Sequence, residues 1–290
     1  MGRLCYNVGM KVKAYAKLNL TLNVLGKSGN FHQIDSIVTT VDVFDEVQVT
    51  LRKDKKVRFD CDLADCPVFL NSAYRAAVAF RAETGVGCNV AIKKHIPVGG
   101  GMGGSSADAA AVLFCLQKLT SVSHEVVFEI AKSVGSDVNA LLCGGFCRMR
   151  GKGDDVTKIA SNLQLDFAVI RLGSPVSAGQ AYAYWDELGS KPQAADCDSI
   201  MQLLQAGDCS AIHGFSNNLQ VGVCNRLEDY PRLADVCKTH GLPLCMTGSG
   251  NCFYVPCVSK TDASNAAKLL TSSGFSTFVC ASTDVGVIRV

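Results

Sequence analysis

The chain has 290 residues, of which 48% are hydrophobic and 19% charged. A chain of this length and composition can bury a sizeable apolar core, so global disorder is excluded. The net charge of +2 is too small for a protein that binds nucleic acid mainly through its phosphates, and we expect no nucleic-acid partner.

The sequence predicts neither a targeting segment nor a membrane span. Residues 1–9 contain no apolar run of the signal-peptide kind, and the longest uncharged stretch, residues 241–259, is interrupted by proline and glycine. The fifteen cysteines include no Cys-x-x-Cys pair and lie within apolar runs. We interpret them as buried free thiols and expect a cytoplasmic protein without a structural metal site.

The first half of the chain is rich in strand patterns. Apolar residues occupy every second position from Val12 to Val24, which predicts one long strand. Further strands are expected at residues 36–43, 47–51, 57–60, 89–94 and 146–150. Helices are expected at residues 71–84, where Gly85 ends the helix, at residues 105–119, and at residues 123–134, where Ser123 is the cap.

The second half is more helical. Helices are expected at residues 178–188, 199–205, 218–226, 232–240 and 261–273, with strands at residues 167–172 and 275–281 and a surface loop at 189–198. Strands and helices do not alternate regularly, so the fold class is α+β rather than a parallel α/β sheet. We place a domain boundary near Ser161, which gives domains of residues 1–160 and 161–290.

A glycine cluster follows Pro97 and leads directly into an apolar helix. Five of the six residues from Gly99 to Gly104 are glycine, and Ser105 and Ser106 follow them. Free amides at a helix N-terminus, together with glycines that let the backbone approach closely, form a binding site for phosphate. A flexible connector would not need so many glycines, and we favour phosphate binding.

Two familiar phosphate-binding motifs do not explain this loop. The spacing Gly99-x-Gly101-x-x-Gly104 matches the dinucleotide fingerprint, but a second helix follows where that motif requires a strand. A P-loop is also excluded at Gly26-Lys27-Ser28, because Thr21 stands at the position of the first glycine.

Three further features have both a structural and a functional interpretation. Asp137 opens a short apolar run and is either a helix cap or a functional carboxylate. Lys17 stands between apolar neighbours in the first strand and is either a lysine on a solvated face or a charged partner in a site. The run Thr247-Gly248-Ser249-Gly250 is either an ordinary turn or part of a binding site.

These motifs stand in the order of the three motifs of the GHMP small-molecule kinases, which the chain resembles over nearly its whole length. The glycine loop is specific for the superfamily. The stretch from Ala16-Lys17-Leu18-Asn19-Leu20 through Phe31-His32 to Asp35-Ser36 resembles one branch. That branch phosphorylates the 2-hydroxyl of 4-diphosphocytidyl-2-C-methyl-D-erythritol in the non-mevalonate isoprenoid pathway.

The resemblance implies a two-domain fold, with ATP at the glycine loop and a small-molecule substrate carrying cytidine diphosphate in the cleft between the domains. It implies that Asp137 is the catalytic base and Lys17 its charged partner, and that Mg²⁺ accompanies ATP. The implied ATP-binding residues are Pro97, Gly99, Gly100, Gly101, Gly103, Gly104, Ser105 and Ser106. The implied substrate-binding residues are Asn19, Phe31, His32, Asp137, Tyr182 and Gly248.

Two residues depart from the branch. Phe31 stands where a tyrosine is usual, so stacking survives without the hydroxyl, and Asn139 stands where proline usually follows Asp-Val. The alternatives are a related kinase acting on homoserine, mevalonate or a sugar, and a catalytically silent nucleotide-binding regulator. His32 argues against a related kinase, because a residue that contacts cytidine has no purpose for a substrate without a base. The retained Asp137 and Lys17 argue against a silent regulator. We expect a monomer or a homodimer.

Overall fold

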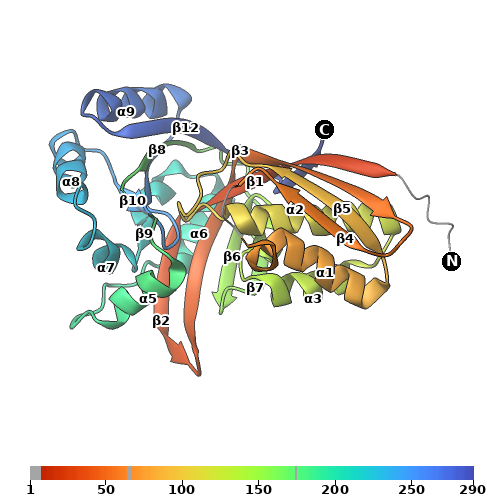
Figure 1. Ribbon diagram of the computed structural model, residues 1–290. Helices are drawn as coiled ribbons and strands as arrows, with labels where there is room; N and C mark the ends of the chain where they lie inside the picture. Colours follow the sequence, from red (N-terminus) through yellow and green to blue (C-terminus); the bar gives the residue numbers. More distant parts are fainter. Residues whose placement is uncertain (1–7, 64–66, 174) are drawn as a thin grey trace.

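The fold is α+β, as the sequence predicts, with helices packed on an extended network of mostly antiparallel strands (Figure 1). The computed structural model describes residues 8–63, 67–173 and 175–290. Most of the segment 1–9 discussed above therefore lies outside the described residues. Pairing connects all the described strands into one network, and the division into domains 1–160 and 161–290 stays a prediction.

The first half is built around one long strand, β3 (Phe31–Arg52). It pairs antiparallel with β1 (Gly9–Asn19), β2 (Thr21–Ser28), β5 (Gly87–Lys93) and β6 (Phe146–Gly151). Two short strands, β4 (Val57–Cys61) and β7 (Asp155–Lys158), extend this sheet beyond β5 and β6. The sheet therefore combines strands that come before the helices of this half with strands that come after them.

The prediction of separate strands at residues 36–43 and 47–51 is wrong, because both belong to β3. The pairing register shifts there: Tyr15 pairs with Phe44, but the next residue, Ala16, pairs with Val41. Two residues are therefore extra on β3, which is a bulge. The bulge interrupts the alternation of apolar residues without ending the strand.

The single strand predicted from Val12 to Val24 is also wrong, because it is divided at Leu20 into β1 and β2. Side chains replace part of the regular ladder at this point. The backbone amide of Ile37 donates to Thr21 Oγ1 at 2.8 Å, and Ser36 Oγ donates to the Thr21 carbonyl. Strand periodicity does not reveal this break between β1 and β2, because apolar and polar side chains still alternate across it.

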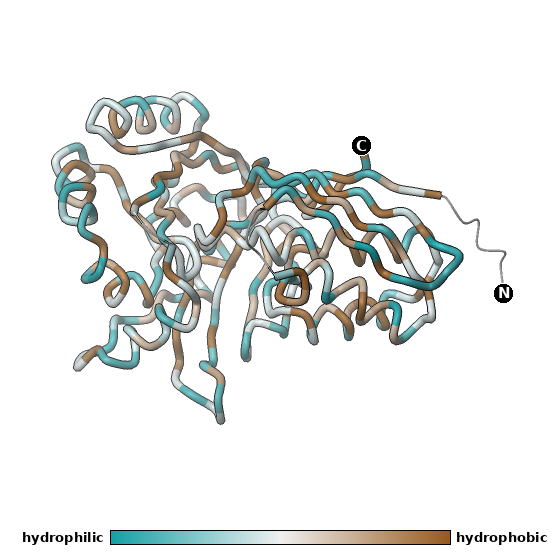
Figure 2. Tube along the Cα trace, viewed as in Figure 1, coloured by the Kyte–Doolittle hydropathy of each residue, from teal (hydrophilic) through white to brown (hydrophobic). Residues whose placement is uncertain are grey.

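Helices cover one face of this sheet (Figure 1). The α-helices of this half are α1 (Ser72–Thr84), α2 (Gly104–Thr120), α3 (His124–Val134) and α4 (Val138–Cys143). The short α4 packs against α2 and α3. The sequence predicted the first three to within one or two residues, including the Ser123 cap. Figure 2 shows hydrophilic segments at the turn between β3 and β4 and at the tip of the β2–β3 hairpin, away from this buried layer.

The second half contains its own antiparallel strands, β8 (Asp166–Arg171), β10 (Cys245–Met246), β11 (Cys252–Cys257) and β12 (Ser276–Thr283). The sequence missed β11, because every one of its residues is buried and no alternation is visible. The end of β12 pairs with β3 through Ser282 and Thr283, which joins the two halves. A two-residue strand, β9 (Ser216–Asn217), pairs with β2.

Five α-helices lie in this half: α5 (Ala178–Asp186), α6 (Cys197–Ala206), α7 (Gln220–Cys224), α8 (Tyr230–Thr239) and α9 (Lys260–Ser272). The short 3-10 helices are η1 (Val68–Leu70) and η2 (Cys209–Gly214). The expected loop 189–198 is shorter than predicted, because Asp196 caps α6 by accepting from the Ser199 amide at 3.0 Å.

The cysteines are free in the described part of the chain, and most are buried, as expected; Cys209 is the exposed one. None of the described helices is both long and apolar enough to cross a membrane.

The last strand, β13 (Val287–Arg289), returns to the first half and pairs with β1. The residue before it, Gly286, lies directly against α4: a Cβ placed there would be 1.7 Å from the Leu141 carbonyl oxygen. Gly286 also accepts a hydrogen bond from the backbone amide of Tyr15 at 2.8 Å. This glycine therefore sets the distance between α4 and β1.

We predict that Gly286→Ala destabilises the protein, because α4 or β1 must move to make room for the methyl group. The expected loss in unfolding free energy is about 1–3 kcal/mol, measured by denaturant unfolding. Gly179→Ala is the control, since no atom lies within 4 Å of its Cβ position. That variant should be unchanged or more stable by up to about 1 kcal/mol. Equal stability of the two variants would show that α4 is not held at Gly286.

Candidate active site

A cavity of about 940 Å³ lies where the two halves of the chain meet. The glycine loop, the start of α2, the end of β1, the tip of the β2–β3 hairpin and helix α5 line it. All residues assigned to ATP, substrate and catalysis in the sequence line this cavity: Lys17, Asn19, Phe31, His32, Pro97, Gly99, Gly100, Gly101, Gly103, Gly104, Ser105, Ser106, Asp137, Tyr182 and Gly248. Their individual roles stay predictions.

The glycine loop packs backbone against backbone on the turn Thr247-Gly248-Ser249-Gly250. A Cβ on Gly101 would lie 2.2 Å from the Thr247 carbonyl oxygen, and a Cβ on Gly250 would lie 2.5 Å from the backbone of Gly100 and Gly101. Gly101 has a φ of +76°, a conformation that favours glycine. The two backbones can therefore pack this closely only with glycine on both sides, and the turn is part of the site.

The loop delivers a free helix N-terminus to the cavity. Gly103, with a φ of +73°, is the N-cap of α2 and offers no side chain to its first amides. The first amides of a helix have no acceptor within the helix, and the helix dipole adds positive potential there. With the hydroxyls of Ser105 and Ser106 beside it, this end of the cavity suits an anion such as phosphate.

Lys17 reaches this point from β1 and is only 4% exposed, so it is not a lysine on a solvated face. Its Nζ donates to Asn19 Oδ1 and lies 3.4 Å from Asp137 Oδ2. A Cβ on Gly103 would be 3.0 Å from Lys17 Cγ, so glycine leaves room for the lysine stem. The structure thus brings the predicted lysine and aspartate together beside the helix N-terminus.

Asp137 stands at the N-cap position of α4, but its side chain accepts no hydrogen bond from the helix. The carboxylate faces Lys17 instead, and 30% of its side chain is exposed, so a substrate group can reach it. Asn139, two residues further along, is buried, and its Nδ2 donates to the Phe128 carbonyl at 3.4 Å. The helix therefore forms behind Asp137 without the proline that is usual at this position in the resembling branch.

The other end of the cavity is aromatic. His32 stacks on Tyr182 of α5, with ring centroids 4.5 Å apart and planes 18° apart, and its Nε2 lies 2.8 Å from Asp186 Oδ1. Burial, with a smaller effect of the Asp137 charge, raises the pKa of Tyr182 to about 12. Phe31 is 61% exposed at the start of β3. One face of Tyr182 is thus covered by His32, which the sequence did not predict.

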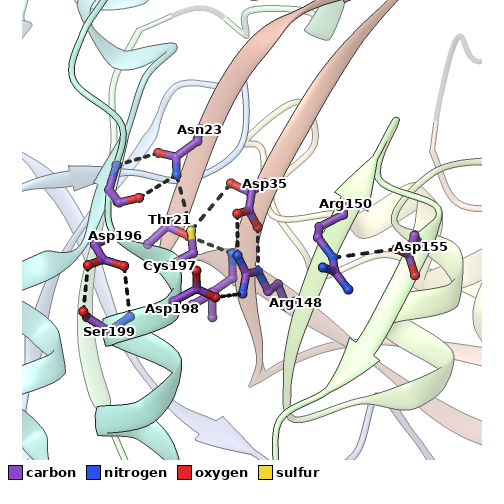
Figure 3. Close-up of polar contacts among 12 residues, drawn as sticks. Thr21, Asn23, Asp35, Arg148, Arg150, Asp155, Asp196, Cys197, Asp198 and Ser199 are labelled. Atoms are coloured by element: carbon purple, nitrogen blue, oxygen red, sulfur yellow. Dashed lines mark hydrogen bonds and ion pairs between the residues drawn. The ribbon is translucent and has the colours of Figure 1, made fainter.

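The base of the β2–β3 hairpin is fixed by charged and polar contacts (Figure 3). Arg148 of β6 forms a two-pronged pair with Asp35, at 2.8 Å and 2.7 Å, and a bond of 2.5 Å to Asp198 of α6. Asn23 exchanges two hydrogen bonds of 2.8 Å with the backbone of Ala195. These contacts hold the hairpin that carries Phe31 and His32 against α6 and the segment before it.

Four charged cavity residues were not predicted from the sequence. Lys152 lies over the Phe31 ring at 5.8 Å. Asp186 lies one helical turn after Tyr182, so the i, i+4 spacing on α5 was its signal. Lys94 and Asp108 are buried partners, and no sequence pattern joins them. Within the described residues, no group of three or more His, Cys, Asp or Glu is placed to hold a metal ion.

The chain is similar to known proteins along most of its length. Residues 71–145 match the model of the N-terminal domain of GHMP kinases. A 4-diphosphocytidyl-2-C-methyl-D-erythritol kinase of Caldicellulosiruptor saccharolyticus is 32% identical over 269 residues, which cover 90% of this chain and 92% of that one. A kinase of the same name from Clostridium perfringens is 31% identical and covers 83% of this chain and 86% of its own length.

Solved structures have the same fold. A crystal structure of 4-(cytidine 5'-diphospho)-2C-methyl-D-erythritol kinase aligns with a TM-score of 0.75 at 23% identity, covering 94% of this chain and all of that one. Homoserine kinase from Cytophaga hutchinsonii aligns with a TM-score of 0.78 at 18% identity over the full length of both chains. At these identities the likeness concerns the fold alone.

Proposed function

This chain belongs to the family of the 4-diphosphocytidyl-2-C-methyl-D-erythritol kinases, a branch of the GHMP kinases, and we propose that it phosphorylates the 2-hydroxyl of that compound with ATP. The reaction is a step of the non-mevalonate isoprenoid pathway. The observation that carries the proposal is the Lys17–Asp137 pair, which opens into the cavity beside a free helix N-terminus. A cytoplasmic location and a monomeric or homodimeric state stay predictions.

Asp137 is the base in this proposal. Its carboxylate accepts the proton of the substrate hydroxyl as that oxygen attacks phosphorus. A carboxylate is a weak base for a free alcohol, so the proton moves late, when the hydroxyl has become acidic. Lys17 lies 3.4 Å from Asp137 and holds the carboxylate in position at the cavity wall. Its buried ammonium also offsets negative charge that develops on the transferred group.

The glycine loop and the first turn of α2 hold the nucleotide. The residues fit this role, because the glycines of the loop line the cavity and the α2 amides have no side-chain cap. ATP supplies the phosphoryl group, and the Mg²⁺ that accompanies it offsets phosphate charge. The hydroxyls of Ser105 and Ser106 stand at the same helix end and can donate to phosphate oxygens.

The hairpin tip and α5 recognise the cytidine part of the substrate. Phe31 offers an exposed ring for stacking, and His32 and Tyr182 form the aromatic wall behind it. Asp186 accepts from His32 Nε2, so the other ring nitrogen, Nδ1, is the one left to contact a base. Asn19, whose Nδ2 donates to Ser36 at 2.9 Å, lies near the transferred group, and Gly248 borders the same space.

A panel of acceptors tests the function directly. We expect ADP release from ATP with 4-diphosphocytidyl-2-C-methyl-D-erythritol and not with homoserine, mevalonate or simple sugars. A preference for one of those acceptors would place the protein in a related branch, which the homoserine kinase fold alone does not exclude. Nucleotide binding without turnover on any acceptor would favour a silent regulator.

We predict that His32→Ala weakens binding of the cytidine substrate and spares ATP. Loss of a base contact costs about 1–3 kcal/mol, or roughly a tenfold to hundredfold rise in KM. Steady-state kinetics with each substrate varied in turn measures both effects. His213→Ala, an exposed histidine outside the cavity, is the control. Equal losses for both substrates would indicate a structural histidine, and no loss would indicate a different substrate class.

We predict that Asp137→Asn retains both binding sites and lowers turnover by about 10²–10⁴-fold, the usual cost of removing a general base. Lys17→Met should also lower turnover, and the double variant should be little worse than the worse single one, because groups that act together are not additive. Single-turnover phosphoryl transfer, with nucleotide affinity measured separately, distinguishes chemistry from binding.

The matched control is Asp155→Asn, a largely exposed carboxylate on β7 that should leave turnover unchanged. Asparagine caps a helix about as well as aspartate, and Asp137 makes no cap bond to α4. Loss of a helix cap therefore cannot imitate loss of the base. Near-normal phosphoryl transfer by Asp137→Asn would remove this residue from the mechanism.

A further inference from the structure

A second buried charged cluster lies beneath the glycine loop, separate from the Lys17–Asp137 pair. It consists of Lys94, just after β5, Asp45 on β3 and Asp108 on α2. Lys94 Nζ forms ion pairs with both carboxylates, at 2.6 Å to Asp108 Oδ2 and closer to Asp45 Oδ2. The side chains of Asp45 and Asp108 are 0% and 2% exposed, so water does not solvate their charge.

Both carboxylate oxygens of Asp45 have hydrogen-bond partners, and they fix the residues that lead into the glycine loop. Its Oδ1 accepts hydrogen bonds from the backbone amides of His95, at 2.5 Å, and Ile96, at 2.8 Å, and its Oδ2 binds Lys94. The Lys94 amide donates to Asp62 Oδ1 at 2.9 Å. Residues 94–96 are thus fixed to the sheet immediately before the loop begins.

Asp108 is only half bonded. Its Oδ2 binds Lys94, whereas its Oδ1 is buried and has no hydrogen-bond partner. A buried carboxylate oxygen without a partner is costly when it is charged. One ammonium also faces two carboxylates here, so the three side chains carry a net charge of −1 when all are ionised. Protonation of Asp108 removes both the charge beside the unpartnered oxygen and the excess negative charge of the cluster.

The groups around Asp108 do not supply another positive charge. Lys94 and Asp45 act on it directly, Cys61 at the end of β4 faces it, and Asp62 lies beside Lys94. In the described part of the chain, the other elements packed on α2 place no charged group against Asp108. Burial, opposed by Lys94 and reinforced by Asp45, raises the pKa of Asp108 to about 7, and the two carboxylates raise the pKa of Lys94 despite its burial.

This cluster adjoins the nucleotide end of the cavity. Lys94 and Asp108 both line the cavity, and a Cβ on Gly104 would lie 3.4 Å from Lys94 Nζ. Asp108 stands one turn into the helix whose first amides are proposed to receive the phosphates. An ionised Asp108 therefore repels a bound polyphosphate, and a neutral one does not.

We propose that Asp108 is a positioning residue for nucleotide binding, which takes up a proton from solvent when the nucleotide binds and leaves a neutral Lys94–Asp45 ion pair beneath the loop. The inference rests on the proposed ATP site at the glycine loop. In this proposal Lys94 and Asp45 stay paired when the nucleotide binds, and Asp108 loses its negative charge.

The direction of the pH effect follows from linkage. The nucleotide raises the pKa of Asp108 further, so binding is tightest where Asp108 is already protonated in the free protein. The dissociation constant rises as pH increases through the pKa of the free protein and levels off above the pKa of the complex. Asp108→Asn mimics the protonated acid and loses this dependence.

The test is the dissociation constant of ATP from pH 5.5 to 9 for the wild type and Asp108→Asn, measured by calorimetry. At low pH the two should bind equally. At pH 8.5 the variant should bind more tightly, by roughly threefold to tenfold, and proton uptake, read from buffers of different ionisation enthalpy, should disappear. Comparing the two proteins cancels the ionisation of ATP itself.

His95→Gln is the control, because His95 is the histidine next to Lys94 in the chain and its side chain is 43% exposed. It should keep the wild-type pH dependence. Weaker binding by Asp108→Asn at every pH would show a merely structural role, and an unchanged pH profile would show that another group takes the proton. No ATP binding by the wild type would instead overturn the proposed function.

Discussion

The arrangement of the site depends on the burial of one ammonium group. Lys17 is 4% exposed, and a charge at such a depth is tolerated only with close polar partners. Asn19 and Asp137 provide them, from the same strand and from the start of α4. Gly103 provides the space, and Thr247 accepts from the Asn19 amide at 3.0 Å. Strand, loop, helix and turn therefore meet at the lysine because it requires all of them.

The two charged clusters of the cavity differ in how their buried charges are balanced. The Lys17–Asp137 pair balances one charge with one charge and leaves the carboxylate open to a substrate hydroxyl. The cluster under the loop has an excess carboxylate and is almost sealed, so burial raises the pKa of Asp108 and favours its protonated form. One pair suits chemistry on a substrate, and the other suits support of the glycine loop, which we propose holds the phosphates.

Local patterns predicted the fold well where one face of an element is buried. The end of α1 and the start of α3 followed from Gly85 and Ser123, whose caps the structure contains. The prediction failed where bonding is not local: the bulge opposite Tyr15 concealed the continuity of β3, and the fully buried β11 has no alternation. In the site, motifs located the cavity-lining glycines, whereas the Lys94–Asp108 contact joins residues on two elements without any motif.

The return of β13 to the first sheet has a consequence for biosynthesis. Residues at the far end of the sequence close the edge of β1, and Gly286 supports the helix that begins after Asp137. A nascent chain that has already displayed the glycine loop on the ribosome still lacks this support and the turn at Thr247 that packs on the loop. The incomplete chain therefore exposes an open strand edge, a hazard for aggregation. It also lacks part of the cavity wall, because the turn at Thr247 has not yet been synthesised.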